Sequence, residues 1–78
     1  MSPTQVTVTW TFYMLSLLRK RLGLAWEDFD KLQGQYNLSA FLYQQYELLH
    51  YYDNDYIIND TLKYITEQGG NINDLRRS

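Results

Sequence analysis

The spacing of apolar residues in the second half of the chain most constrains the fold. Between residues 38 and 65 these residues recur three or four positions apart, in two segments separated by a polar Asp-Asn-Asp sequence at residues 53–55. This period places them on one face of an α-helix, whereas a half-buried strand alternates every second residue. Aspartate and asparagine favour turns and helix caps. The pattern therefore predicts two helices joined by a tight corner, the first capped by Asn37 or Ser39 and the second closed by Gly69.

The first half of the chain predicts two more helices. Residues 12–22 suit a helix that Gly23 ends, with three cationic residues in its last turn, where they meet the negative end of the helix dipole. A short second helix with an acidic start should end near Gly34. Residues 5–12 are ambiguous, because valine and threonine alternate there with the period of a strand. A lone strand would have no partner, so we expect the first helix to begin at about Thr9 and keep the strand as the alternative.

Four helices with short connections predict an all-α fold, a compact bundle in which neighbouring helices run roughly antiparallel. We expect one domain over residues 1–68 and a flexible tail over residues 69–78. The first helix is apolar nearly all round. A helix of this kind is either central in a bundle or covered by another chain, which predicts self-association or partner binding there.

Composition and charge argue against several classes of function. A net charge of −2 gives no excess of Lys and Arg for phosphate contacts, so we expect no nucleic acid as the main ligand. The absence of cysteine excludes disulfides and thiolate metal sites, and fits a reducing cytosol. With no basic, apolar leader and no long apolar run, the prediction is a cytoplasmic protein that spans no membrane.

The sequence also offers little for catalysis or for metal binding. His50 is the only histidine, and no nearby nucleophile and acid complete a catalytic set around it. The carboxylates around residues 53–60 fail the spacing of a calcium loop, since Ile58 stands where a glycine is needed and Tyr64 where a glutamate is needed. We therefore predict no enzyme, no cofactor and no metal, with helix capping as the role of the aspartates.

Tyrosine is the residue type that points to a function. Six of the eight tyrosines lie between residues 38 and 65, too many for the core of so short a chain. Tyrosine is common at interface anchors because it joins a rigid apolar ring to a polar tip. We therefore expect some of these rings at the surface, in a partner-binding face. The predicted partner-binding residues are Tyr43, Tyr46, His50, Tyr51, Tyr52 and Tyr56.

The segment FLYQQYELLHYYDNDYIINDTLKYI resembles a family of short bacterial helical domains of unknown function. The shared features are an aromatic and Leu-His pair that ends one helix, a polar corner, and a Tyr-Ile-hydrophobic-x-Asp start to the next. The resemblance covers roughly residues 10–66, and the matching positions are Tyr46, Leu49, His50, Tyr56, Ile57, Ile58 and Asp60. Members of that family are often encoded beside, or fused to, an ADP-ribosyltransferase-like domain, as in toxin–antitoxin pairs. The resemblance thus implies an accessory or neutralising, antitoxin-like role with a toxin-like partner.

Three hypotheses follow for the function. The leading one is a non-enzymatic, cytoplasmic interaction domain that docks through the face from Tyr43 to Tyr56. The second is a small self-assembling structural or regulatory protein that forms a homodimer by two-fold symmetry. The third is a helix-turn-helix DNA-binding regulator over residues 25–50, which is disfavoured because its recognition helix carries no Lys or Arg for phosphates.

Overall fold

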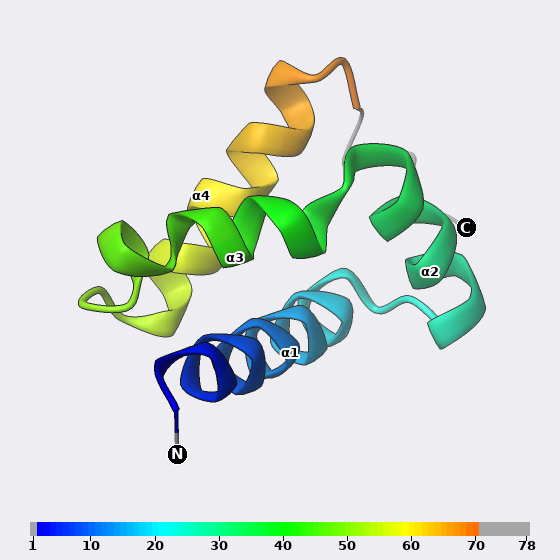
Figure 1. The fold of residues 1–78 in the computed structure, drawn as a ribbon. Coiled ribbons are helices and arrows are strands. Elements are labelled where there is room, and N and C mark those ends of the chain that lie inside the picture. Colours follow the sequence, from blue (N-terminus) through cyan, green and yellow to red (C-terminus); the bar gives the residue numbers. More distant parts are fainter. Residues whose placement is uncertain (1, 71–78) are drawn as a thin grey trace.

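A computed structural model describes residues 2–70 of the chain. It contains four α-helices joined by short turns (Figure 1), and no strand occurs within this range. The helices are α1 (Pro3–Leu22), α2 (Trp26–Tyr36), α3 (Leu38–Leu49) and α4 (Asn54–Glu67). The predicted all-α fold is confirmed. The tail expected over residues 69–78 lies outside the described residues from residue 71 onward.

Helix α1 begins six residues before the predicted start at Thr9, and the strand considered for residues 5–12 is absent. Both expectations are wrong because a capping box starts the helix. The Ser2 hydroxyl accepts a hydrogen bond from the Gln5 backbone N–H at 3.2 Å, and the Gln5 side chain accepts one from the Ser2 backbone N–H at 3.1 Å. Pro3 occupies the first helical position, where its missing N–H is no loss. Local capping therefore outweighs the β-propensity of the valines and threonines.

The two turns that flank α2 differ in how they are held. Gly23 ends α1 in the left-handed conformation, with φ of 68°, as the sequence predicts. The Arg19 guanidinium spans the turn that follows: it donates to the Leu24 carbonyl oxygen at 2.9 Å and lies 4.5 Å from the Trp26 ring centroid. At its other end α2 runs past the predicted stop at Gly34 to Tyr36. A single residue, Asn37, then separates α2 from α3.

All four helices contribute to one core. Phe29, Leu38 and Ile65 are fully buried, and they come from α2, α3 and α4. Ten more apolar side chains complete the core, namely Met14, Leu15, Leu18, Leu22, Leu24, Leu32, Leu42, Leu49, Ile57 and Ile58. The buried Thr61 hydroxyl donates to the Ile57 carbonyl oxygen of its own helix at 2.9 Å, so it leaves no unmet hydrogen bond inside.

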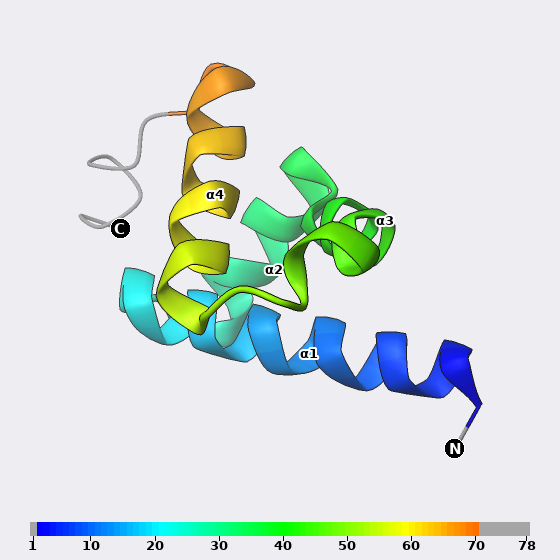
Figure 2. The ribbon, with the colours of Figure 1, turned by 90° about the vertical axis from the view of Figure 1, so that its left-hand side faces the viewer.

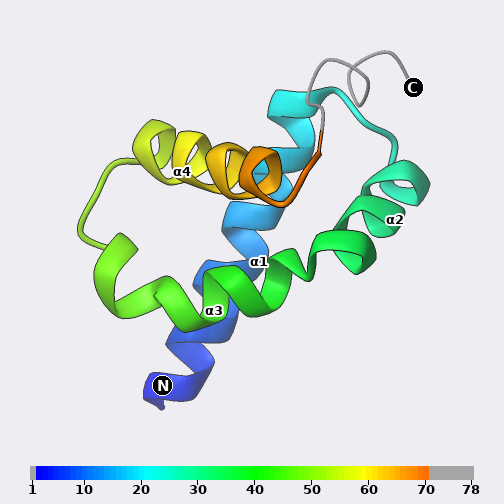
Figure 3. The ribbon, with the colours of Figure 1, turned by 90° about the horizontal axis from the view of Figure 1, so that it is seen from above.

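Helix α1 packs against both α3 and α4, and it crosses them steeply (Figures 2 and 3). The expectation that neighbouring helices run roughly antiparallel therefore does not hold for α1. At 20 residues α1 is the longest helix, and α3 and α4 cross its middle and C-terminal half. Only its N-terminal end extends beyond them (Figure 2). The buried residues of the first helix run from Thr11 to Leu22, so it packs in the bundle over most of its length and is exposed at its N-terminal end.

Candidate protein-interaction surface

The corner between α3 and α4 exposes three of the predicted tyrosines. Tyr51 is 80% exposed, Tyr52 52% and Tyr56 48%. The rings of Tyr52 and Tyr56 stack on each other, with centroids 4.3 Å apart and planes 20° from parallel. The Asp53 carboxylate accepts a hydrogen bond from the Tyr56 backbone N–H at 2.8 Å, which caps α4 as predicted for these aspartates. We call Tyr51, Tyr52 and Tyr56 the tyrosine corner.

Two polar contacts hold the tyrosine corner against α1. The Arg21 guanidinium pairs with the Asp55 carboxylate at 2.6 Å, and the Asn54 side-chain amide donates to the Tyr13 hydroxyl at 3.2 Å. The ion pair is partly open to solvent, so its contribution to stability is small. Both contacts come from the first turn of α4 and reach residues of α1. The start of α4 is therefore fixed in position relative to α1.

A row of stacked rings leads from α1 to the tyrosine corner. Trp10 meets the Tyr46 ring edge-on with centroids 5.2 Å apart, and Tyr46 stacks on His50 at 4.3 Å. His50 in turn lies 3.9 Å from the Tyr51 ring centroid. The His50 Nδ1 atom lies 2.6 Å from the Tyr46 carbonyl oxygen, and since a carbonyl can only accept, Nδ1 donates this bond. Tyr46 and His50 are half-buried, so they support the exposed Tyr51 more than they offer faces of their own.

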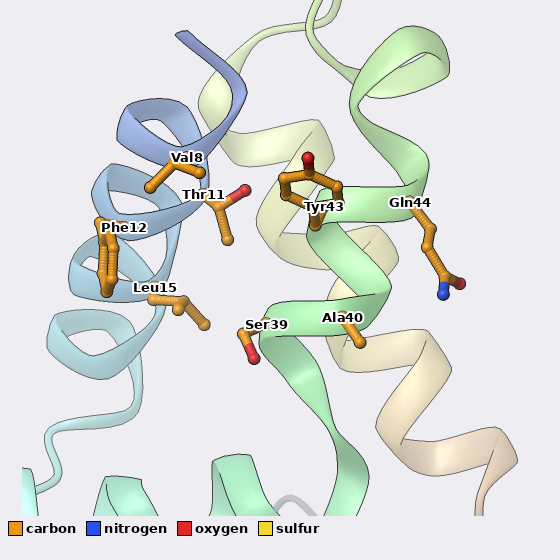
Figure 4. Close-up of a pocket in the computed structure, with 8 residues that line it drawn as sticks. All are labelled: Val8, Thr11, Phe12, Leu15, Ser39, Ala40, Tyr43 and Gln44. Atoms are coloured by element: carbon orange, nitrogen blue, oxygen red, sulfur yellow. The ribbon is translucent and has the colours of Figure 1, made fainter. Parts of the chain in front are cut away.

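Tyr43 belongs to a different surface. It lines an open groove of about 340 Å³ between α1 and α3 (Figure 4). The other lining residues are Val8, Thr11, Phe12, Leu15, Ser39, Ala40 and Gln44. None of them is charged. We call this set of residues the α1–α3 groove.

The structure thus divides the six predicted partner-binding residues among three places. The tyrosine corner holds three of them, the ring row holds Tyr46 and His50, and the α1–α3 groove holds Tyr43. The expectation that some tyrosines of this segment reach the surface is confirmed. The expected face from Tyr43 to Tyr56 is therefore divided in two: Tyr43 lies in the groove, whereas Tyr46 and His50 lead into the tyrosine corner.

The sequence did not predict which apolar residues of α1 are exposed. Phe12 is 66% exposed, and Val6, Val8 and Tyr13 are exposed as well. The sequence does indicate that some of them are exposed, because this helix is apolar nearly all round and one bundle cannot cover every side of it. Leu48 on α3, 67% exposed, was also missed. Its place in the three- and four-residue spacing gave no sign of it.

The two aspartates beside the tyrosine corner have structural roles. Asp53 caps a helix and Asp55 forms an ion pair, so both carboxylates already have partners. Across residues 2–70, which the structure describes, no group of three or more His, Asp or Glu side chains lies close enough together to hold a metal ion. Among the same residues, no helix combines the length and the apolar character needed to cross a membrane.

Comparison of the chain with protein-family models, with curated proteins and with solved structures finds no match.

Proposed function

We propose that the chain is a non-enzymatic protein-interaction domain whose partner binds the tyrosine corner. The observation that carries the proposal is the stacked pair of Tyr52 and Tyr56, which leaves about half of each ring exposed beside the more exposed Tyr51. A buried ring contributes more to a protein interface than most side chains do. Three such rings at one corner are enough for the centre of an interface.

The arrangement of the corner supports binding because the rings are already ordered. Ordering rotamer-rich side chains on association costs free energy, and rings held beforehand avoid much of that cost. Here the Tyr52–Tyr56 stack fixes two rings against each other, and the ring row backs Tyr51 through His50. The contacts from Asn54 and Asp55 to α1 hold the backbone beneath them.

The charge around the corner favours one kind of partner. The Asp53 carboxylate is exposed at its rim, the neighbouring Asp55 is already paired with Arg21, and the whole chain carries a net charge of −2. A partner with lysine or arginine around an apolar centre would be steered to this corner, since complementary rim charges raise association rates. The family resemblance adds a candidate, an ADP-ribosyltransferase-like, toxin-like protein that the chain would neutralise as an antitoxin-like subunit in the cytoplasm.

The test is capture of the product of the adjacent gene by the immobilised chain. Tyr52→Ala and Tyr56→Ala should each raise the dissociation constant by about thirtyfold or more, because a central interface ring contributes about 2 kcal/mol. Far-UV circular dichroism should show unchanged helical content, since both rings are half-exposed. Binding can be measured by calorimetry once the captured protein is purified.

Trp26→Ala is the matched control for this experiment. Trp26 is 53% exposed, carries a larger ring than tyrosine, and lies at the start of α2, away from the tyrosine corner. The proposal expects this variant to capture the partner as the wild type does. Equal capture by the wild type and by both tyrosine variants would remove the proposal.

A further inference from the structure

The N-terminal half of α1 has exposed apolar residues on two sides. No side chain from residue 2 to residue 18 is charged. Val8 and Phe12 are exposed on the side that lines the α1–α3 groove, whereas Val6 and Tyr13 are exposed on another side. The side that lines the groove is a second surface, separate from the tyrosine corner. Exposed helix faces of soluble domains normally carry charged residues, and an extended apolar surface without them marks a contact site.

The α1–α3 groove runs along this half of α1, and it presents a protruding ring next to a hollow. Phe12 is 66% exposed on one wall, and the small residues Ser39 and Ala40 form the opposite wall (Figure 4). The only polar groups nearby are uncharged. The Thr11 hydroxyl donates to the Thr7 carbonyl oxygen at 2.8 Å, so it keeps a hydrogen-bond acceptor when another molecule covers the groove.

From these features we infer that a second copy of this chain covers the α1–α3 groove, in a two-fold symmetric dimer. A two-fold interface uses the same patch on both subunits, so the patch must be complementary to itself. A protruding Phe12 beside a hollow meets this requirement, because each copy can place its ring in the groove of the other. A face without charge meets it as well, since self-pairing brings like charges together wherever a face is charged.

This inference does not depend on the proposed function. The α1–α3 groove and the tyrosine corner share no residue, so a dimer can form whether or not a partner binds the corner. The measurements also differ. The dimer is tested by the mass of the purified chain alone, and the proposed function is tested by capture of another protein.

Sedimentation of the purified chain tests the dimer. The wild type should show twice the 9.4 kDa mass of one chain at high concentration. Phe12→Glu places a carboxylate in an uncharged hollow and should raise the dimer dissociation constant at least about tenfold. Leu48→Glu is the matched control, because Leu48 is 67% exposed and lies outside the groove, and it should leave the dimer intact. Circular dichroism checks that both variants keep their helices.

A complementation experiment tests the contact itself. Ala40→Lys puts a cation into the groove and should also weaken self-pairing. An equimolar mixture of the Phe12→Glu and Ala40→Lys variants should then dimerise, since the heterodimer places one glutamate beside one lysine and one unchanged Phe12 in an unchanged groove. Restoration in the mixture, with neither variant dimeric alone, is the result that the inference predicts.

Three sedimentation results would each overturn the inference, and vesicle binding provides a fourth. The three are a wild type that stays monomeric up to about millimolar concentration, a Phe12→Glu variant as dimeric as the wild type, and a mixture that remains monomeric. An uncharged, apolar helix face can also bind a lipid surface. Cosedimentation with phosphatidylcholine vesicles tests this alternative. Binding of the wild type to those vesicles as a monomer would assign the surface to membrane and not to a second copy.

Discussion

At the scale of single residues, Asn37 has the most demanding backbone position. Its φ of 53° and ψ of 49° lie in the left-handed region, and it is the only residue between α2 and α3. Its N–H donates to the Gln33 carbonyl oxygen and its own carbonyl accepts from the Phe41 N–H at 3.1 Å. The sequence predicted Asn37 as a possible cap of the third helix. It takes that position, but its side chain makes no capping hydrogen bond, so the backbone conformation is its contribution.

Substitutions at Asn37 should separate backbone conformation from side-chain bonding. Asn37→Ala should lower the free energy of unfolding by about 1 kcal/mol, because a β-carbon without a local polar partner is disfavoured in the left-handed region. Asn37→Gly should be as stable as the wild type or slightly more stable, since glycine adopts this conformation without strain. Urea unfolding followed by circular dichroism measures both. A destabilised glycine variant beside an unchanged alanine variant would contradict the assignment.

At the scale of helices, the two N-termini of α1 and α2 contrast in how they are capped. Ser2 and Gln5 form a full capping box at α1, whereas Ala25 stands at the cap position of α2 and makes no side-chain bond. The Ala25 backbone is already extended, with φ of −66° and ψ of 156°, as a capping residue requires. Only the acidic residues Glu27 and Asp28 satisfy the dipole there.

Exchanging the capping side chains should shift stability in opposite directions. Ala25→Ser supplies the missing acceptor and should raise the free energy of unfolding by about 1 kcal/mol, while Ser2→Ala should lower it by a similar amount. Ala25 is exposed, so the added hydroxyl meets no steric obstacle. Thermal melts and urea titrations of both variants measure the shifts. No gain from Ala25→Ser would mean that solvent already satisfies the first turn of α2.

The sequence predicted the helices well and their arrangement poorly, for reasons visible in particular residues. Three- and four-residue spacing located α3 and α4, and Gly23 marked the end of α1. The start of α1 was missed because alternating valine and threonine outweighed the Ser-Pro-x-Gln cap signal at residues 2–5. Steep helix crossing depends on how distant side chains interlock, which spacing along one segment does not encode.

The candidate site could be predicted from the sequence only in part, for the same reason. An excess of tyrosine over core volume predicted exposed rings, and the structure exposes several of them. Which rings are exposed follows from the crossing of α3 over α1, which sends Tyr43 into a groove and leaves Tyr46 stacked between Trp10 and His50. The exposure of Phe12 was not predicted for the same reason. At this position one side of α1 is covered, where Thr11 is buried, and another side is open.

At the scale of the whole molecule, the described chain has more aromatic surface than its core can use. One core of thirteen apolar residues is closed by four helices, and most of the rings left outside lie at the tyrosine corner and around the α1–α3 groove, with Trp26 exposed apart from them on α2. We propose a different protein as the partner of the first surface, whose rim carries Asp53, and a second copy of the chain as the partner of the second, which has no charge. Their separation allows a dimer of this chain to present two tyrosine corners.

Hydroxyl-radical labelling of the tyrosines in the free chain and in the captured complex tests most directly whether the partner binds the tyrosine corner. Binding should protect Tyr51, Tyr52 and Tyr56 several-fold, while labelling of Trp26, which is exposed on α2, should stay unchanged. Equal labelling of the three tyrosines in the free and bound chain, with a partner demonstrably bound, would contradict binding at this corner.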